Sequence, residues 1–190
     1  EEIDNSPTQF GKVIPGDIKY ADLNNDGVIN NNDEGLIANS NIPEVFYGAS
    51  AGINWKNFDF SVLFQGSSNS YRQLSGVAIW EFFQGGKVAK LHEGRWTPEN
   101  AQNATYPALH YGASANNFRP SSFYLDDTSY LRLKNVELGY TFKNVKLSEG
   151  KSLSSIRVYS NAINLHTWTK ARLFDPENYK IHNINCMDPE

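Results

Sequence analysis

Two runs of alternating residues, joined by only two residues, restrict the fold of this chain more than any other feature. From Val45 to Trp55 every second side chain is apolar or aromatic, and the positions between them are mostly small or polar. After Lys56 and Asn57 the alternation resumes, with phenylalanine or valine at positions 58, 60, 62 and 64. A period of two is that of a β-strand, so the pattern predicts a hairpin. Each strand is about ten residues long, the length that a tilted strand needs to cross a bilayer.

A second pair of strands is predicted near the end of the chain. The first runs over residues 129–142 and the second over residues 153–165, with a polar turn between them. The apolar positions of the first strand change phase, since Leu131 and Leu133 are odd whereas Val136 and Leu138 are even. A shift of one residue exchanges the two faces of a strand, so we expect a β-bulge near Lys134 and Asn135.

The connections between these strands differ greatly in length. Residues 67–128 show no clean strand pattern, and a connection of about sixty residues is far longer than usual. Short helices are expected within it at Gly76–Phe83 and Lys87–Glu93. Long connections on one side and short turns on the other are typical of outer-membrane barrels. The predicted fold is therefore all-β, with the antiparallel strands of a transmembrane β-barrel. Its hairpins cover residues 45–66 and 129–165, and its long loops cover residues 1–44, 67–128 and 166–190.

A candidate calcium loop precedes the first strand, in the segment D-L-N-N-D-G-V-I-N-N-N-D. Its oxygen-bearing side chains fall at positions 1, 3, 5, 9 and 12 of an EF-hand-type loop, and Gly27 falls at position 6, where the backbone turns sharply. Position 7 offers a backbone carbonyl, and Ile29 is expected to anchor the loop on apolar neighbours. The departure is aspartate at position 12, where glutamate is usual. The alternative is an Asn/Asp-rich turn that bonds only its own backbone. The predicted ligands are Asp22, Asn24, Asp26, the Val28 carbonyl, Asn30 and Asp33.

Other kinds of chemistry find little support in the sequence. The chain has 17 basic and 21 acidic residues, a net charge of −4, which gives no basic field for nucleic acid. Cys186 is the single cysteine, and the four histidines show no zinc-ligand spacing. No pair of carboxylates is held at a working separation for glycoside hydrolysis, and no nucleophile, base or cofactor motif can be named, so we expect no enzyme.

Two tryptophans of the long connection, Trp80 and Trp96, are candidate substrate-binding residues. Indole rings stack well on flat or amphipathic ligands. The alternative is that these rings form the core of the loop itself, and the sequence favours that alternative.

Several motifs together point to a known family. P-G-D-I-K-Y-A-D-L-N-N-D-G-V-I is followed by Y-G-A-S-A-G-I-N-W-K-N-F-D-F-S-V-L-F-Q-G, R-W-T-P-E-N, S-Y-L-R-L-K-N-V-E-L-G-Y-T-F, I-R-V-Y-S-N-A-I-N-L and F-D-P-E. In this order and spacing the chain resembles the C-terminal barrel region of SusC/RagA-type TonB-dependent outer-membrane transporters. The likeness covers nearly the whole chain. The family's plug, its TonB-contacting N-terminal segment and its last strand are absent, so we expect a piece of a longer protein.

The resemblance implies import of glycans or peptides across the outer membrane of Bacteroidetes-type bacteria. It implies a SusD-type surface lipoprotein as a lid, energy from TonB through the missing N-terminal region, contact with outer-membrane lipid, and no enzymatic activity. The long loops before residue 45, over residues 67–128 and after residue 165 would face outward, and the short turns would face the periplasm.

Two other classes of protein stay open on the residues alone. One is a soluble β-sandwich that binds carbohydrate and is stabilised by the same calcium loop. The other is a calcium-loop adhesion or scaffold module, although such modules normally carry the loop twice. A need for detergent would separate the barrel segment from the β-sandwich.

Overall fold

The computed structural model describes residues 2–38, 41–147, 150, 152–177 and 185–187. The chain divides into two compact units, which we describe separately. One unit comprises Glu1–Asn41, Tyr71–Asp126 and Ile181–Glu190, and the other comprises Ile42–Ser70 and Asp127–Lys180. We call them the loop unit and the sheet unit.

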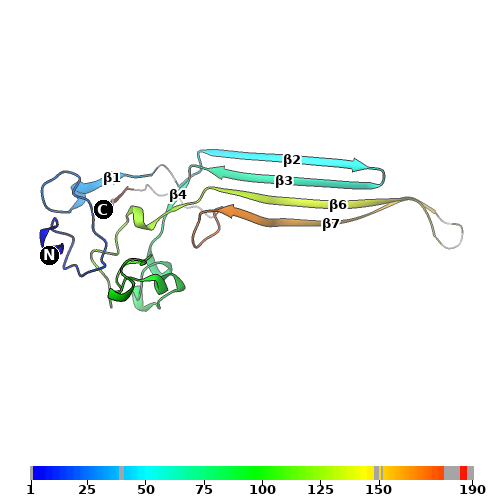
Figure 1. The fold of residues 1–190 in the computed structure, drawn as a ribbon. Coiled ribbons are helices and arrows are strands. Elements are labelled where there is room, and N and C mark those ends of the chain that lie inside the picture. Colours follow the sequence, from blue (N-terminus) through cyan, green and yellow to red (C-terminus); the bar gives the residue numbers. More distant parts are fainter. Residues whose placement is uncertain (1, 39–40, 148–149, 151, 178–184, 188–190) are drawn as a thin grey trace. The chain divides into compact units, whose positions relative to one another are not determined.

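The sheet unit is built on four long antiparallel strands in the order β2-β3-β6-β7 (Figure 1). Strands β2 (Val45–Trp55) and β3 (Phe58–Ser68) form the first predicted hairpin, and β6 (Tyr130–Lys146) and β7 (Ser152–Thr169) form the second. Trp55 pairs with Phe58 and Lys146 with Ser152, so both short turns lie at one end of the sheet. The predicted asymmetry of the connections is confirmed.

The predicted bulge is also confirmed, and it explains the change of phase in β6. Leu63 of β3 pairs with Asn135, but the next residue, Phe64, pairs with Leu133, so Lys134 is the extra residue. The bulge returns the odd-numbered leucines to the same face as Val136 and Leu138. One face of the sheet is therefore predominantly apolar, although Ser68, Ser160 and His166 also lie on it. It carries Val45, Tyr47, Ala49, Ala51, Ile53, Trp55, Phe58, Phe60, Val62, Phe64, Leu131, Leu133, Val136, Leu138, Tyr140, Phe142, Ile156, Val158, Ala162 and Trp168.

Three expectations from the sequence need correction. Strand β6 continues to Lys146, beyond the predicted end at residue 142 and into the predicted polar turn. Strand β7 continues to Thr169, beyond the predicted end at Leu165, because Thr167 and Trp168 still pair with Arg132 and Leu131 of β6. The expected helices in the long connection are single 3₁₀ turns. They are η3 (Gly76–Ala78), η4 (Phe83–Gly85) and η5 (Lys90–Gly94). Left-handed backbone at Phe82 and Gln84 and the glycines at positions 85 and 86 prevent a longer helix there.

The loop unit contains short elements around a core of its own. Its strands pair as β1 (Glu34–Leu36) with β8 (Asn185–Met187) and as β4 (Tyr71–Gln73) with β5 (Leu125–Asp127), the last residue of which belongs to the sheet unit. Further 3₁₀ turns are η1 (Ile3–Asn5), η2 (Asn31–Asp33), η6 (Pro98–Asn100) and η7 (Ser122–Tyr124). The core consists of Ile18, Tyr20, Ile29, Leu74, Ile79, Tyr106 and Tyr124. No helix of the described residues is long and apolar enough to span a membrane.

Candidate functional site

The candidate calcium loop is a series of side-chain turns closed on its own backbone. The two carboxylate oxygens of Asp22 accept hydrogen bonds from the backbone N–H groups of Asp26 at 3.2 Å and Gly27 at 2.7 Å. Asn24 Oδ1 also accepts from the N–H of Asp26, at 2.9 Å. Gly27 has a positive φ of 81°, which a residue without Cβ adopts at little cost. The sharp turn expected at this position is therefore present.

The end of the loop is buried. Asp33 has no exposed surface, and its two carboxylate oxygens accept from the N–H groups of Leu23 at 3.0 Å and Asn30 at 2.8 Å. The hydrogen bond from the backbone N–H of Asn30 lowers the pKa of the Asp33 carboxyl, and burial raises it. Further hydrogen bonds from the N–H groups of Leu23 and Asn24 leave the pKa below its ordinary value. Ile29 is 2% exposed and belongs to the core, as predicted.

The donor set of this loop suits a hard cation, because it consists of carboxylate, amide and carbonyl oxygens. A carboxylate oxygen can also accept from a backbone N–H and bind a cation at the same time. Within the described ranges, however, no three acidic, histidine or cysteine side chains gather into a group that could hold a metal. In addition, the Val28 carbonyl accepts a hydrogen bond from the Asn30 side chain at 3.2 Å. The calcium site therefore stays a prediction that rests on the spacing of its residues.

Trp80 packs within the aromatic part of the loop unit. Its ring stacks on Phe118 with centroids 5.1 Å apart and meets Phe83 edge-on at 5.0 Å. It also packs against the core, and its ring lies 6.5 Å from that of Tyr124. This packing gives Trp80 a structural role, and its predicted contact with substrate stays a prediction.

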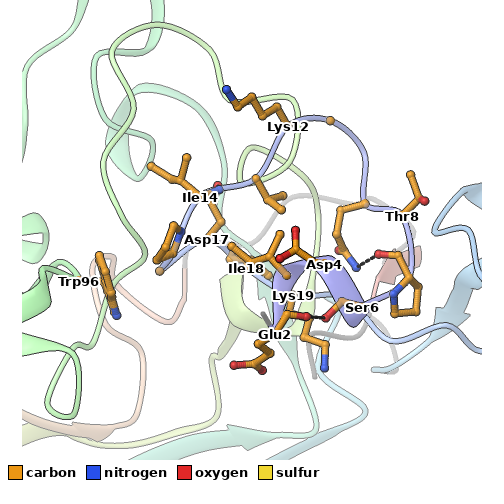
Figure 2. Close-up of a pocket in the computed structure, with 17 residues that line it drawn as sticks. Glu2, Asp4, Ser6, Thr8, Lys12, Ile14, Asp17, Ile18, Lys19 and Trp96 are labelled. Atoms are coloured by element: carbon orange, nitrogen blue, oxygen red, sulfur yellow. Dashed lines mark hydrogen bonds between the residues drawn. The ribbon is translucent and has the colours of Figure 1, made fainter.

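Trp96 lies elsewhere, in the wall of a cavity of about 730 Å³ that residues 2–19 otherwise line (Figure 2). A methyl group placed on Gly16 would collide with the indole ring, so the ring covers this glycine closely. The backbone N–H of Trp96 donates to the carbonyl of Tyr106 at 2.8 Å and fixes the start of the side chain. Trp80 does not line this cavity. The two tryptophans predicted to bind substrate therefore do not share one site.

The structure adds a polar network that the sequence pattern missed. Asp17 Oδ1 lies 2.6 Å from His110 Nε2 and accepts a hydrogen bond from the Asn117 side chain at 2.8 Å. Asn117 in turn accepts from the backbone N–H of Ile18 at 3.1 Å. These bonds tie the P-G-D-I-K-Y segment to residues 93 to 100 positions away in the chain. Contacts of such separation leave no local signal in a sequence.

The second face of the sheet unit is mostly polar, although Phe46, Leu63 and Ile163 lie on it, and it carries an ion-pair cluster. Arg157 of β7 bonds both Asp59 of β3 and Glu137 of β6. Gly139 of β6 lies beneath this bridge, where a Cβ would come within 2.7 Å of the Arg157 guanidinium. The absence of a side chain at Gly139 therefore gives the ion pair the space to cross a central strand.

Comparison with curated proteins gives three relatives that are receptors. The chain is 34% identical to TonB-dependent receptor P26 of Formosa agariphila over 180 residues, which is 93% of this chain and 18% of that receptor. It is 30% identical to TonB-dependent receptor P3 of the same organism, covering 93% of this chain and 17% of the receptor. TonB-dependent receptor SusC of Bacteroides thetaiotaomicron is 27% identical, with coverage of 83% and 15%. The chain spans less than a fifth of the length of these relatives. No family model matches it.

Solved structures show the same arrangement of strands. The structure of the RagAB peptide transporter matches with a TM-score of 0.54 and 28% identity, covering 71% of this chain and 14% of that chain. The RagAB peptide importer in its open-open state matches with a TM-score of 0.53 and 24% identity, covering 77% and 16%. At 24% identity, this second match shows a similar fold and nothing further about function.

Proposed function

Because the chain is a segment of a SusC/RagA-type TonB-dependent receptor, an outer-membrane β-barrel protein, we propose that it forms part of an importer for nutrients. The cargo class that we propose is oligosaccharide or peptide. The similar structure at 28% identity is described as a peptide transporter, and the three curated relatives are named as receptors. None of these names is that of an enzyme, in agreement with the non-enzymatic role expected from the sequence.

The observation that carries this proposal is the division of the sheet into one apolar and one polar face. Strands β2 and β3 have 11 residues each, enough to cross the apolar part of an outer membrane when tilted. Every residue of β2 is exposed in this chain, and so is most of β7. Among the described residues, the outer edges of β2 and β7 also have no paired strand, as predicted. Lipid on the apolar face and further barrel strands on both edges account for these features.

The soluble β-sandwich is less well supported. A sandwich needs a second sheet that covers the apolar face of the first. Besides the four-stranded sheet, the described part of the chain contains only two two-stranded sheets. The relatives found are membrane receptors. We therefore do not propose the sandwich as a second function.

The proposed partners are a SusD-type lipoprotein above the long loops and TonB on the periplasmic side, reached through parts of the receptor outside this chain. Purification of the whole receptor from outer membranes, followed by native mass spectrometry, tests the partner and the cargo together. We expect a co-purifying surface lipoprotein and bound oligosaccharide or peptide. A receptor that purifies alone and empty, and whose deletion leaves growth on glycans and peptides unchanged, would contradict the proposal.

We also propose that the loop of residues 22–33 binds Ca²⁺ and thereby stiffens an external loop that precedes β2 in the chain. Its support is the spacing of the ligands, and an affinity of about 10⁻⁴–10⁻³ M would suffice outside the cell. Limited proteolysis between Pro15 and Leu36 should be slower with calcium than with chelator, and Asp22→Ala should abolish the difference. Glu34→Ala, at an exposed acid outside the proposed ligands, is the matched control. Equal cleavage with calcium and with chelator would show that the loop is a polar turn.

A further inference from the structure

The segment that follows β7 is bonded back onto the polar face of β6. Arg132 is the centre of this contact, with a side chain that is 5% exposed. Its guanidinium donates to both carboxylate oxygens of Asp175 at 2.9 Å and to Glu177 at 2.9 Å. The remaining Nε–H donates to Thr167 Oγ1 of β7 at 2.7 Å. Nη2 thus reaches both oxygens of Asp175 while Nη1 reaches Glu177, and hydrogen bonds between two ionised groups are stronger than those between neutral groups.

The bulge of β6 adds a second cation to the same place. Tyr130 and Arg132 lie on the polar face, and the extra residue of the bulge is Lys134. Glu177 accepts from the Tyr130 hydroxyl at 3.0 Å and from Lys134 Nζ at 3.0 Å, in addition to Arg132. Three side chains of one strand therefore converge on carboxylates.

The carboxylates are adapted to this site. Burial raises the pKa of the Asp175 carboxyl, but the backbone N–H of Glu177 and the Arg132 guanidinium outweigh it and lower the pKa overall. Burial acts in the same way on Glu177, and the bonds from Lys134 and Tyr130 again leave its pKa lowered. Both groups are thus held in the charged form.

Full burial of an apolar side chain in this segment is limited to Pro176. Leu173 is 41% exposed and Phe174 is 43% exposed, so neither is buried against the sheet. The Asp175 side chain is itself 57% exposed and open to water and to competing ions. The ion pairs of Asp175 and Glu177, together with the burial of Pro176 between them, therefore hold the segment on the sheet.

We propose that Tyr130, Arg132 and Lys134 form a carboxylate-binding site on the polar face of β6, and that residues 170–177 are a strap that occupies this site with its own Asp175 and Glu177. A carboxylate on an incoming ligand displaces the strap. The inference rests on the proposed function, which makes the polar face the inner wall of the importer. The closed strap neutralises two cations of that wall, and the open strap exposes them to cargo.

Hydrogen exchange of residues 170–177 in the whole receptor, in detergent, tests the strap. The double variant Asp175→Asn and Glu177→Gln removes both charges with little change in shape, and exchange should become at least about tenfold faster. Lys170→Met is the matched control, because the 84% exposed Lys170 pairs only loosely with Asp127 at 3.6 Å and should leave exchange unchanged. Unchanged exchange in the double variant would overturn the proposal.

The same measurement tests displacement by ligand. Hexaglutamate and a uronic-acid hexamer carry carboxylates from a peptide and from a sugar, and hexaglutamine is the uncharged control. Acceleration of exchange in the native receptor by either acidic probe, and not by hexaglutamine, supports the site and identifies the source of the carboxylate. Failure of both acidic probes would overturn it. Because exchange is read without transport, this result is independent of whether the receptor imports a nutrient.

Discussion

The loop unit and the sheet unit differ in how far they bury their apolar side chains. The loop unit has few regular elements, yet among the described residues it contains every buried alanine, isoleucine, leucine and tyrosine side chain except Tyr130. The sheet unit adds two buried prolines, Pro43 and Pro176. The sheet unit has strands of up to 18 residues, yet most of their side chains are exposed. Long regular strands therefore do not indicate where the core of this chain lies. The loop unit provides its own core, whereas in the proposed barrel the sheet would rely on lipid and on neighbouring strands.

The largest effect that should separate the two units is loss of a core ring in the loop unit. Tyr20 is fully buried, packs edge-on against Phe10 at 5.8 Å and donates from its hydroxyl to the carbonyl of Asn116 at 3.0 Å. Tyr20→Ala should cost about 3–5 kcal/mol of local stability. Hydrogen exchange should rise across the loop unit and stay unchanged in β2 and β3.

Tyr111→Ala is the matched control, because this tyrosine is 97% exposed and its loss should cost less than about 0.5 kcal/mol. If Tyr20→Ala loosened the sheet as much as the loops, the two units would be one cooperative structure, and the comparison above would be wrong.

The next effect concerns the apolar face of the sheet. Phe60→Arg or Val62→Arg should destabilise the assembled barrel by about 2–4 kcal/mol near the middle of the bilayer. Ser61→Arg, on the polar face of the same strand, should be milder. Folding in outer-membrane vesicles, followed by the shift in gel mobility on heating, measures the difference. Equal tolerance of all three changes would indicate a sheet in water.

A smaller effect is expected at Gly66, on the apolar face of the sheet. The Tyr47 ring lies over Gly66, and its hydroxyl donates to the Tyr130 carbonyl at 2.8 Å. A Cβ on Gly66 would come within 2.5 Å of that carbonyl oxygen. Gly66→Ala should therefore cost about 1–3 kcal/mol through overpacking.

The matched variant is Gly52→Ala on the neighbouring strand, where a new Cβ meets its nearest atom at 3.5 Å, an ordinary contact. Thermal unfolding of the receptor in detergent compares the two. A larger loss of stability in Gly52→Ala than in Gly66→Ala would show that the packing of Tyr47 on Gly66 is unimportant.

The smallest effect is an acid response confined to the loop unit. The pKa of Asp33 is lowered in the folded chain, so its contribution to stability is present above its unfolded value of 3.8 and is lost as pH falls through the folded value. Protection of residues 22–33 against proteolysis should be constant from pH 7 to pH 5 and decline below about pH 4. Asp33→Asn should remove this dependence on pH, and a decline that persists in the variant would assign it to another group.

The local patterns of the sequence were sufficient for the two long hairpins and the bulge, but not for the ends of β6 and β7 or for the short strands of the loop unit. A strand repeats every two residues, so alternation in β2 and β3 and the change of phase at Lys134 are visible without any knowledge of partners. The sharp turn at Gly27 and the side-chain turns around it are local for the same reason. The motifs were also sufficient to identify the family, which the relatives then supported.

The tertiary structure alone decided which distant residues meet. Asp17 and His110 are 93 positions apart, Arg132 and Asp175 are 43 apart, and Asp59 reaches Arg157 across Gly139. Each of these pairs depends on how the chain returns to itself, and a single sequence carries no periodic signal for that return. The end of β7 was missed because its pairing with β6 shifts register between Ile163 and His166, where Asn164 has a positive φ of 52°. This shift interrupts the alternation, although Thr167 and Trp168 are residues that favour strands.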